Sequence, residues 1–134
     1  MQAVKGKGTK LEQSLFAMLE EIGLSGWERN VTSIVGAPDA LFPEERVIIF
    51  IDGCFWHGCP HCNRPLPVTN HDYWERKIER TKARDKKNRA ALTDEGWTVI
   101  SIWEHEMRDP SSREQIAATI LTALERGRLH HDAR

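Results

Sequence analysis

Apolar residues recur every three or four positions in two segments, one near each end of the chain. The first group is Leu11, Leu15, Met18, Leu19 and Ile22. Its spacing predicts a helix over residues 10–22 that ends at Gly23. The second group is Ile116, Ile120, Leu121 and Leu124. It predicts a helix that Ser111 or Ser112 caps and Gly127 ends, with residues 128–134 as a polar tail.

Two other segments are apolar at almost every position and are typical of strands. Within residues 46–51, the run from Val47 to Ile51 lacks the alternation of a strand with one face in water, so we expect both of its faces to be covered. Residues 97–103 predict a second strand of the buried type. Residues 38–42 precede the first segment by a short turn, which predicts a hairpin. Residues 27–31 favour a further short strand.

A long charged segment over residues 73–93 predicts an extended helix, with a cap among residues 70–72. The order of elements is helix, strand, hairpin, loop, long helix, strand and helix. This order is typical of an α/β fold with three layers and a mixed sheet. We expect one domain over residues 1–134, with residues 1–8 and 128–134 flexible.

Composition excludes few functions, but the distribution of charge is uneven. The formal net charge is −1, and the chain has neither an apolar run of about 20 residues nor a secretory signal, which favours the cytoplasm. Residues 76–89 nevertheless hold eight Lys/Arg and two acids. Such a stripe is either a solvated helix face or a phosphate-binding surface, for which Lys77, Arg80 and Arg84 are the candidates.

All three cysteines lie in the loop that follows the strand over residues 46–51. Cys54, Cys59 and Cys62 could supply three thiolates to a structural zinc ion, which needs a fourth ligand. The candidates for that ligand are His57, His61, His71 and His105. Free cysteines and a redox CxxC pair are the alternatives, but a redox pair normally begins a helix in a thioredoxin-like unit. A Cys-rich loop with Gly and Pro favours zinc.

Carboxylates and an imidazole stand at the ends of the hairpin strands. Asp39 begins one strand, Asp52 ends the other, and His57 follows five residues later. Carboxylates so placed can bind Mg²⁺, and an imidazole can act as general base toward water. Each residue alone has an ordinary explanation, since Asp39 could be a turn residue and Glu12 could reach back to Thr9 in a capping box.

Several blocks of sequence together resemble the very-short-patch repair (Vsr) endonucleases. The most specific block is FIDGCFWH at residues 50–57, and further matches lie at residues 6–12, 36–39, 73–78, 84–85, 92–99 and 102–104. The resemblance implies the PD-(D/E)XK restriction-endonuclease fold. It also implies a Mg²⁺-dependent enzyme that nicks one strand 5′ of the thymine in a T:G mismatch left by deamination of 5-methylcytosine. Its partner would be mismatched double-stranded DNA in a bacterial nucleoid, with mismatch-repair proteins as further candidates and a monomer as the expected state.

The resemblance also assigns roles to residues of this chain. Asp39 would bind Mg²⁺ with the main-chain carbonyl of Ile51, His57 would activate the attacking water, and Glu12 would lie near the active site. The residues that would hold a structural zinc ion are Cys54, Cys59, Cys62 and His105. The aromatic residues that would wedge into the DNA stack beside the mismatch are Phe55, Trp56 and Trp74.

One departure from the family pattern falls within the active site. Residue 52 is Asp, where the best-known members carry a second histidine, so Asp52 would either bind metal or orient His57. Two other functions stay open. One is a related nicking, restriction, homing or defence nuclease with a different DNA specificity, and the other is a zinc-containing DNA-binding module without catalysis.

Overall fold

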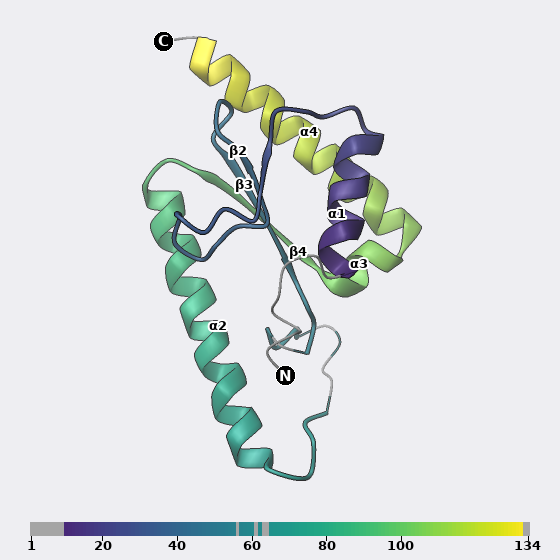
Figure 1. Cartoon of the computed structure of the whole chain (residues 1–134), viewed down its shortest axis with the longest axis vertical. Helices are drawn as coiled ribbons and strands as arrows, with labels where there is room; N and C mark the ends of the chain where they lie inside the picture. Colours follow the sequence, from purple (N-terminus) through teal and green to yellow (C-terminus); the bar gives the residue numbers. More distant parts are fainter. Residues whose placement is uncertain (1–9, 56, 61, 63–64, 133–134) are drawn as a thin grey trace.

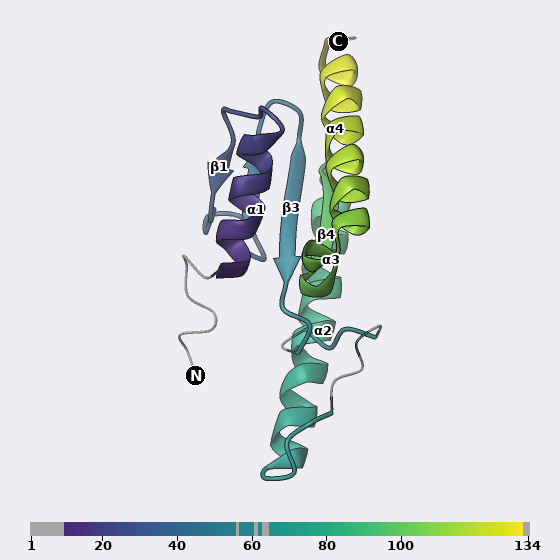
Figure 2. The same ribbon diagram turned by 90° about the vertical axis from the view of Figure 1, so that its right-hand side faces the viewer.

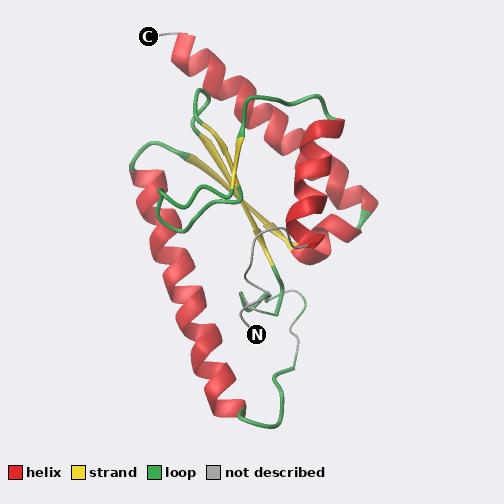
Figure 3. Cartoon of the chain, in the orientation of Figure 1, coloured by secondary structure: helices red, strands yellow, loops and turns green. Residues whose placement is uncertain are grey.

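The computed structural model describes residues 10–55, 57–60, 62 and 65–132. Its elements follow the predicted order (Figures 1 and 3). They are α1 (Lys10–Glu21), β1 (Glu28–Arg29), β2 (Ala40–Phe42), β3 (Val47–Asp52), α2 (His71–Asp94), β4 (Thr98–Trp103), α3 (Glu104–Arg108) and α4 (Pro110–Asp132). The short helix α3 was not predicted. No helix in the described ranges combines the length and apolarity that crossing a bilayer requires.

The four strands form one mixed sheet in the order β1-β2-β3-β4. The β2 strand pairs antiparallel with both β1 and β3, whereas β4 lies parallel to β3. The parallel register sets Ile51 opposite Ile102 and Asp52 opposite Trp103. The α/β class, the hairpin and the mixed sheet are therefore confirmed, while the PD-(D/E)XK assignment stays a prediction.

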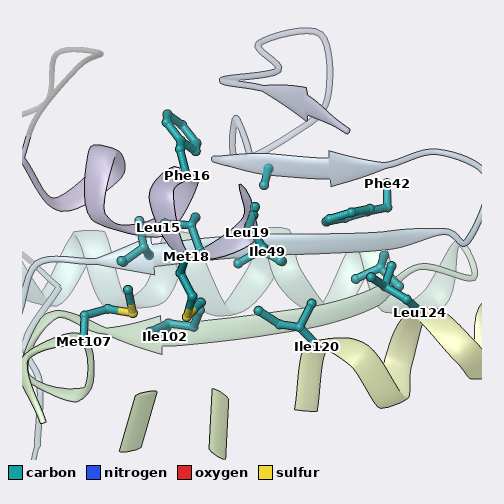
Figure 4. Close-up of a cluster of buried hydrophobic side chains, with 13 residues drawn as sticks. Leu15, Phe16, Met18, Leu19, Phe42, Ile49, Ile102, Met107, Ile120 and Leu124 are labelled. Carbon is teal, nitrogen blue, oxygen red and sulfur yellow. The ribbon is translucent and has the colours of Figure 1, made fainter. Parts of the chain in front are cut away.

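Every residue of β3 is buried because helices cover both faces of the sheet. Val47, Ile49 and Ile51 belong to a large core shared with α1, α3 and α4 (Figure 4). Ile48 and Phe50, on the opposite face, pack with Leu41 of β2 and with Leu92 at the C-terminal end of α2. Figure 1 shows the sheet between these two layers, and Figures 1 and 2 both show the first half of α2 extending past it.

Two details at helix ends correct the predictions, and a third prediction is not tested. The carboxylate of Asp109, and neither predicted serine, caps α4, because it accepts hydrogen bonds of 2.9 Å from the backbone N–H and the hydroxyl of Ser112. Asn70 occupies the N-cap position of α2, but its side chain makes no capping hydrogen bond. Thr9, the partner proposed for Glu12, lies outside the described residues.

The prediction that α4 ends at Gly127 is wrong, since the helix runs through this residue to Asp132. A Cβ added at Gly127 would lie 2.3 Å from the carbonyl oxygen of Glu45, in the turn between β2 and β3. The missing side chain therefore serves close packing of the helix against that turn and not helix termination. The residues expected to form a polar tail continue the helix as far as Asp132.

Candidate active site and metal centre

A cleft of about 870 Å³ opens beside the ends of β2 and β3, between α1 and α2. It is lined by all four residues proposed for catalysis: Glu12, Asp39, Asp52 and His57. Ile51, Asp85 and Arg89 also line it. Residues that are far apart in the sequence therefore share one concave surface, as a catalytic site requires.

Asp39 is held at the rim of the sheet by its own backbone and side chain. Its N–H donates to the carbonyl of Ile49, and its Oδ2 accepts a 2.8 Å hydrogen bond from the N–H of Ile51. Burial and then the charges of Glu12 and Asp52 raise the pKa of Asp39 to about 6, although the Ile51 N–H opposes them. A cation would offset this accumulation of negative charge.

The main-chain carbonyl of Ile51 faces the same edge as Asp39. The N–H and C=O of one residue in a strand point to the same side, and the Ile51 N–H is bound by Asp39. The carboxylates of Asp39 and Glu12 and the carbonyl of Ile51 are thus oxygen donors on one cleft. Such a donor set suits Mg²⁺, which prefers oxygen ligands and retains water.

His57 reaches the cleft because its loop packs closely on α2. Gly58 has a φ of +64°, and a Cβ there would lie 2.6 Å from Cδ of Lys82 and 3.0 Å from Ile78. One turn further along the same helix, Oδ2 of Asp85 lies 2.5 Å from Nδ1 of His57. This loop glycine therefore allows the approach that brings the imidazole to its carboxylate.

The hydrogen bond to Asp85 determines which nitrogen of His57 faces the cleft as a base. Burial works against ionisation of Asp85, but the bond from His57 and the nearby arginines lower its pKa. An ionised carboxylate can only accept, so Nδ1 carries a proton, and in the neutral imidazole the lone pair is on Nε2. Sequence reasoning used Asp85 only as a match in a motif. The clue to its role in the sequence is an acid within the basic stripe of α2, seven residues after the buried Ile78.

Asp52 is buried and bound by Arg89, another residue that the sequence did not single out. Arg89 donates from Nη1 to Oδ2 of Asp52 at 2.6 Å and from Nη2 to Oδ1 at 2.9 Å. Oδ1 of Asp52 lies 3.8 Å from Nδ1 of His57, which is beyond hydrogen-bonding distance. Asp85 is therefore the nearer partner of the histidine.

The predicted zinc ligands come together in one group. The side chains of Cys54, Cys59, Cys62 and His105 place one ligand atom each within 4.8 Å of the others. Nδ1 of His105 lies 3.4, 3.7 and 3.3 Å from the three sulfurs. Zn–S and Zn–N bonds of about 2.3 and 2.0 Å at tetrahedral angles imply an S–N edge of about 3.6 Å. The four residues therefore form a group that could bind structural zinc.

Burial explains why this cysteine group suits a cation. Cys54 is 2% exposed. Burial, together with the neighbouring thiols, raises its pKa to about 12, although a hydrogen bond from the backbone of His105 opposes them. Metal binding reverses this preference because it stabilises the thiolate directly. Helix α3 begins at Glu104 and so presents His105 to the loop from the end of β4.

Two of the three predicted DNA-wedging aromatics are described, and they contact each other. The ring of Phe55 packs edge-on against Trp74 with centroids 5.7 Å apart, and Trp74 contacts Tyr73 in the same way. Trp56, the third predicted wedge residue, and His61 lie outside the described residues. The structure thus places an aromatic group at the start of α2, beside the loop that carries the three cysteines.

The basic residues of α2 divide by the direction of their side chains. Arg84 lines the cleft and is 59% exposed, so it is available to a phosphate there. Lys77 and Arg80 lie nearer the start of α2, outside the walls of the cleft. Arg89, at the end of the stripe, turns inward to Asp52.

The chain is similar in sequence to DNA mismatch endonucleases and to type II nicking enzymes. A family model described as DNA mismatch endonuclease Vsr matches residues 1–64. The type II nicking enzyme V.XorIIP of Xanthomonas oryzae pv. oryzae is 38% identical over 90% of this chain and 88% of its own length. V.NaeI of Lentzea aerocolonigenes, also a type II nicking enzyme, is 37% identical over 98% and 75%. The DNA mismatch endonuclease Vsr of Escherichia coli K12 is 33% identical over 91% and 76%.

Proposed function

This chain belongs to the Vsr family of DNA mismatch endonucleases, and on that premise we propose that it nicks one strand of DNA 5′ of the thymine in a T:G mismatch. The nick would begin very-short-patch repair of deaminated 5-methylcytosine. The observation that carries this proposal is one cleft holding an acidic group around Asp39 and a histidine oriented by Asp85. A cation held by carboxylates and a general base each accelerate hydrolysis of a phosphodiester.

The acidic group would hold the catalytic cation. Asp39 and the carbonyl of Ile51 supply its principal protein ligands, and Glu12 adds negative charge from α1. When bound, Mg²⁺ would polarise the scissile phosphate and stabilise the leaving oxygen. The raised pKa of Asp39 supports this role, because a site that is unfavourable for a carboxylate alone favours binding of a cation.

His57 would supply the general base. Its Nδ1 proton is held by Asp85, so Nε2 can take a proton from water and make that water a better nucleophile. The carboxylate of Asp85 then stabilises the imidazolium that forms, as an ionised partner does for any catalytic histidine. The group of Cys54, Cys59, Cys62 and His105 would keep the loop that carries His57 rigid and has no open position for a catalytic water.

Recognition of the mismatch would rest on unstacking. A T:G wobble pair is weaker than a matched pair, so separating its step from the next is less unfavourable. Phe55 and Trp74 form an aromatic group beside the active site that could enter the opened step, together with Trp56. Arg84 and, further along α2, Lys77 and Arg80 would contact phosphates.

A second candidate is a nicking endonuclease of the same family that reads a different DNA context. The observation that favours it is the name of two relatives, which are type II nicking enzymes. The two candidates share the active site and differ only in the DNA that they accept. Nicking of mismatched and fully paired duplexes of the same sequence separates them.

The test of catalysis compares the wild type with Asp39→Asn on a T:G duplex labelled on either strand. We expect the wild type to nick only the strand with the mispaired thymine, and only when Mg²⁺ is present. Asp39→Asn should lose this activity by a factor of about 100 or more while binding the duplex with similar affinity. Binding without nicking by the wild type would instead identify a zinc-containing DNA-binding module.

A further inference from the structure

Asp52 and Arg89 form a buried ion pair that the proposed chemistry does not use. Asp52 is 4% exposed and is the one buried charged residue in the described part of the chain. Arg89 donates hydrogen bonds to both carboxylate oxygens of Asp52 and, at 3.1 Å, to the hydroxyl of Ser101. Its Cζ lies 4.1 Å from the ring centre of Phe50. A guanidinium fixed on several sides in this way has one orientation.

The pair stands directly beside the catalytic histidine. Nδ1 of His57 lies 2.5 Å from Oδ2 of Asp85 and 3.8 Å from Oδ1 of Asp52. Two carboxylates thus flank one imidazole nitrogen, which carries a single proton. The oxygen of Asp52 that faces His57 is the one that Nη2 of Arg89 holds at 2.9 Å.

We propose that Arg89 is a positioning residue for catalysis. By binding both oxygens of Asp52, it prevents Asp52 from competing with Asp85 for the Nδ1 proton of His57. The imidazole then keeps one partner and one orientation, with Nε2 toward the cleft. This inference rests on the proposed function, in which His57 is the general base, and it makes Asp52 the residue that Arg89 restrains.

The alternative role for Arg89 is direct contact with the scissile phosphate. The geometry argues for positioning, because both Nη atoms already donate to Asp52 and only 18% of the side chain is exposed. Removing Arg89 alone would leave a carboxylate buried without its partner next to an imidazole. Removing the charge of Asp52 as well would abolish the competition. The two roles therefore predict opposite outcomes for the double variant.

The experiment compares Arg89→Met, Asp52→Asn and the double variant with Arg126→Met, the same change at an exposed position of α4. We expect Arg89→Met to lower kcat for nicking by roughly 100-fold, the lower range of a lost general base, with KM for DNA within about twofold. The double variant should recover to within about tenfold of wild type. A double variant as slow as Arg89→Met, or a KM that rises with kcat unchanged, would overturn the proposal.

A spectroscopic measurement tests the same pair without activity. In protein labelled with ¹⁵N-histidine, the Nδ1 proton of His57 should resonate at low field because of its short bond to Asp85. The signal should be lost in Arg89→Met and return in the double variant, and its persistence in folded Arg89→Met would refute the inference. If Arg89→Met does not fold, Arg89→Lys, which keeps the charge but cannot hold both oxygens, should weaken the signal. A wild type that shows the signal but does not nick T:G DNA would reject the proposed function alone.

Discussion

Replacing Asp39 by Asn is expected to make the Mg²⁺-free protein more stable while it abolishes nicking. The pKa of Asp39 is raised from its ordinary value of 3.8 to about 6, chiefly by burial. The folded state therefore holds this proton more tightly than the unfolded state, and stability falls as pH rises from about 4 to about 6. The amide has no proton to lose, and its oxygen can still accept from Ile51.

The size of the effect follows from the two pKa values. One pKa unit corresponds to about 1.4 kcal/mol, so ionisation of Asp39 lowers the free energy of unfolding by about 3 kcal/mol at pH 7.5. At pH 5 this loss of stability is about half as large, because Asp39 is then mostly protonated in the folded state. The gain in Asp39→Asn should therefore shrink by about half between pH 7.5 and pH 5.

The assay is urea unfolding followed by circular dichroism, in buffers freed of Mg²⁺ on a resin so that no soluble chelator removes zinc. Adding Mg²⁺ should stabilise the wild type and leave Asp39→Asn unchanged. Asp85→Asn is the matched control with the opposite sign, because the pKa of Asp85 is lowered by His57 in the folded state. Equal or lower stability of Asp39→Asn at pH 7.5, or a gain that does not depend on pH, would refute this reasoning.

Three further predictions concern the zinc group, the aromatic group and α4. Native mass spectrometry should find about one zinc ion per chain and its loss in Cys62→Ser, and a metal-free wild type would contradict this. Phe55→Ala should lower the ratio of nicking rates on T:G and matched DNA, whereas an unchanged ratio in the folded variant would assign Phe55 to packing. Gly127→Ala should lower the free energy of unfolding by roughly 1–3 kcal/mol, since its Cβ would overlap Glu45. If instead the free energy of unfolding rises by about 1 kcal/mol, as expected for Gly→Ala at an exposed helical position, α4 can move away from Glu45 and the packing argument is wrong.

Local patterns predicted most of the elements, although not the short helix α3. The uninterrupted apolar run of β3 indicated a strand covered on both faces, and cores on both sides confirm it. The loop cysteines indicated a metal group from their spacing alone. His105, from the end of β4, completed that group only through the resemblance, since the sequence left four histidines open.

Contacts between distant segments could not be predicted in the same way. Gly127 has the sequence signature of a helix end, and its real reason is the backbone of Glu45 in a remote turn. Asp85 and Arg89 lie in a basic stripe that suggested a solvated face, yet both turn inward, Asp85 to His57 in the loop after β3 and Arg89 to Asp52 at the end of β3. The partner of Asp85 depends on how the loop at Gly58 packs on α2, and that of Arg89 depends on how α2 packs on β3. No local period records either contact.

The central claim is that this chain nicks DNA at T:G mismatches. The most direct measurement incubates the zinc-loaded wild type and Mg²⁺ with a library of duplexes that carry one T:G pair in randomised flanks, beside the fully paired library, and maps every nick by sequencing. We predict nicks 5′ of the mispaired thymine, on that strand alone, in a restricted set of flanking contexts. Equal nicking of the fully paired library, or nicks at positions unrelated to the mismatch, would contradict the account.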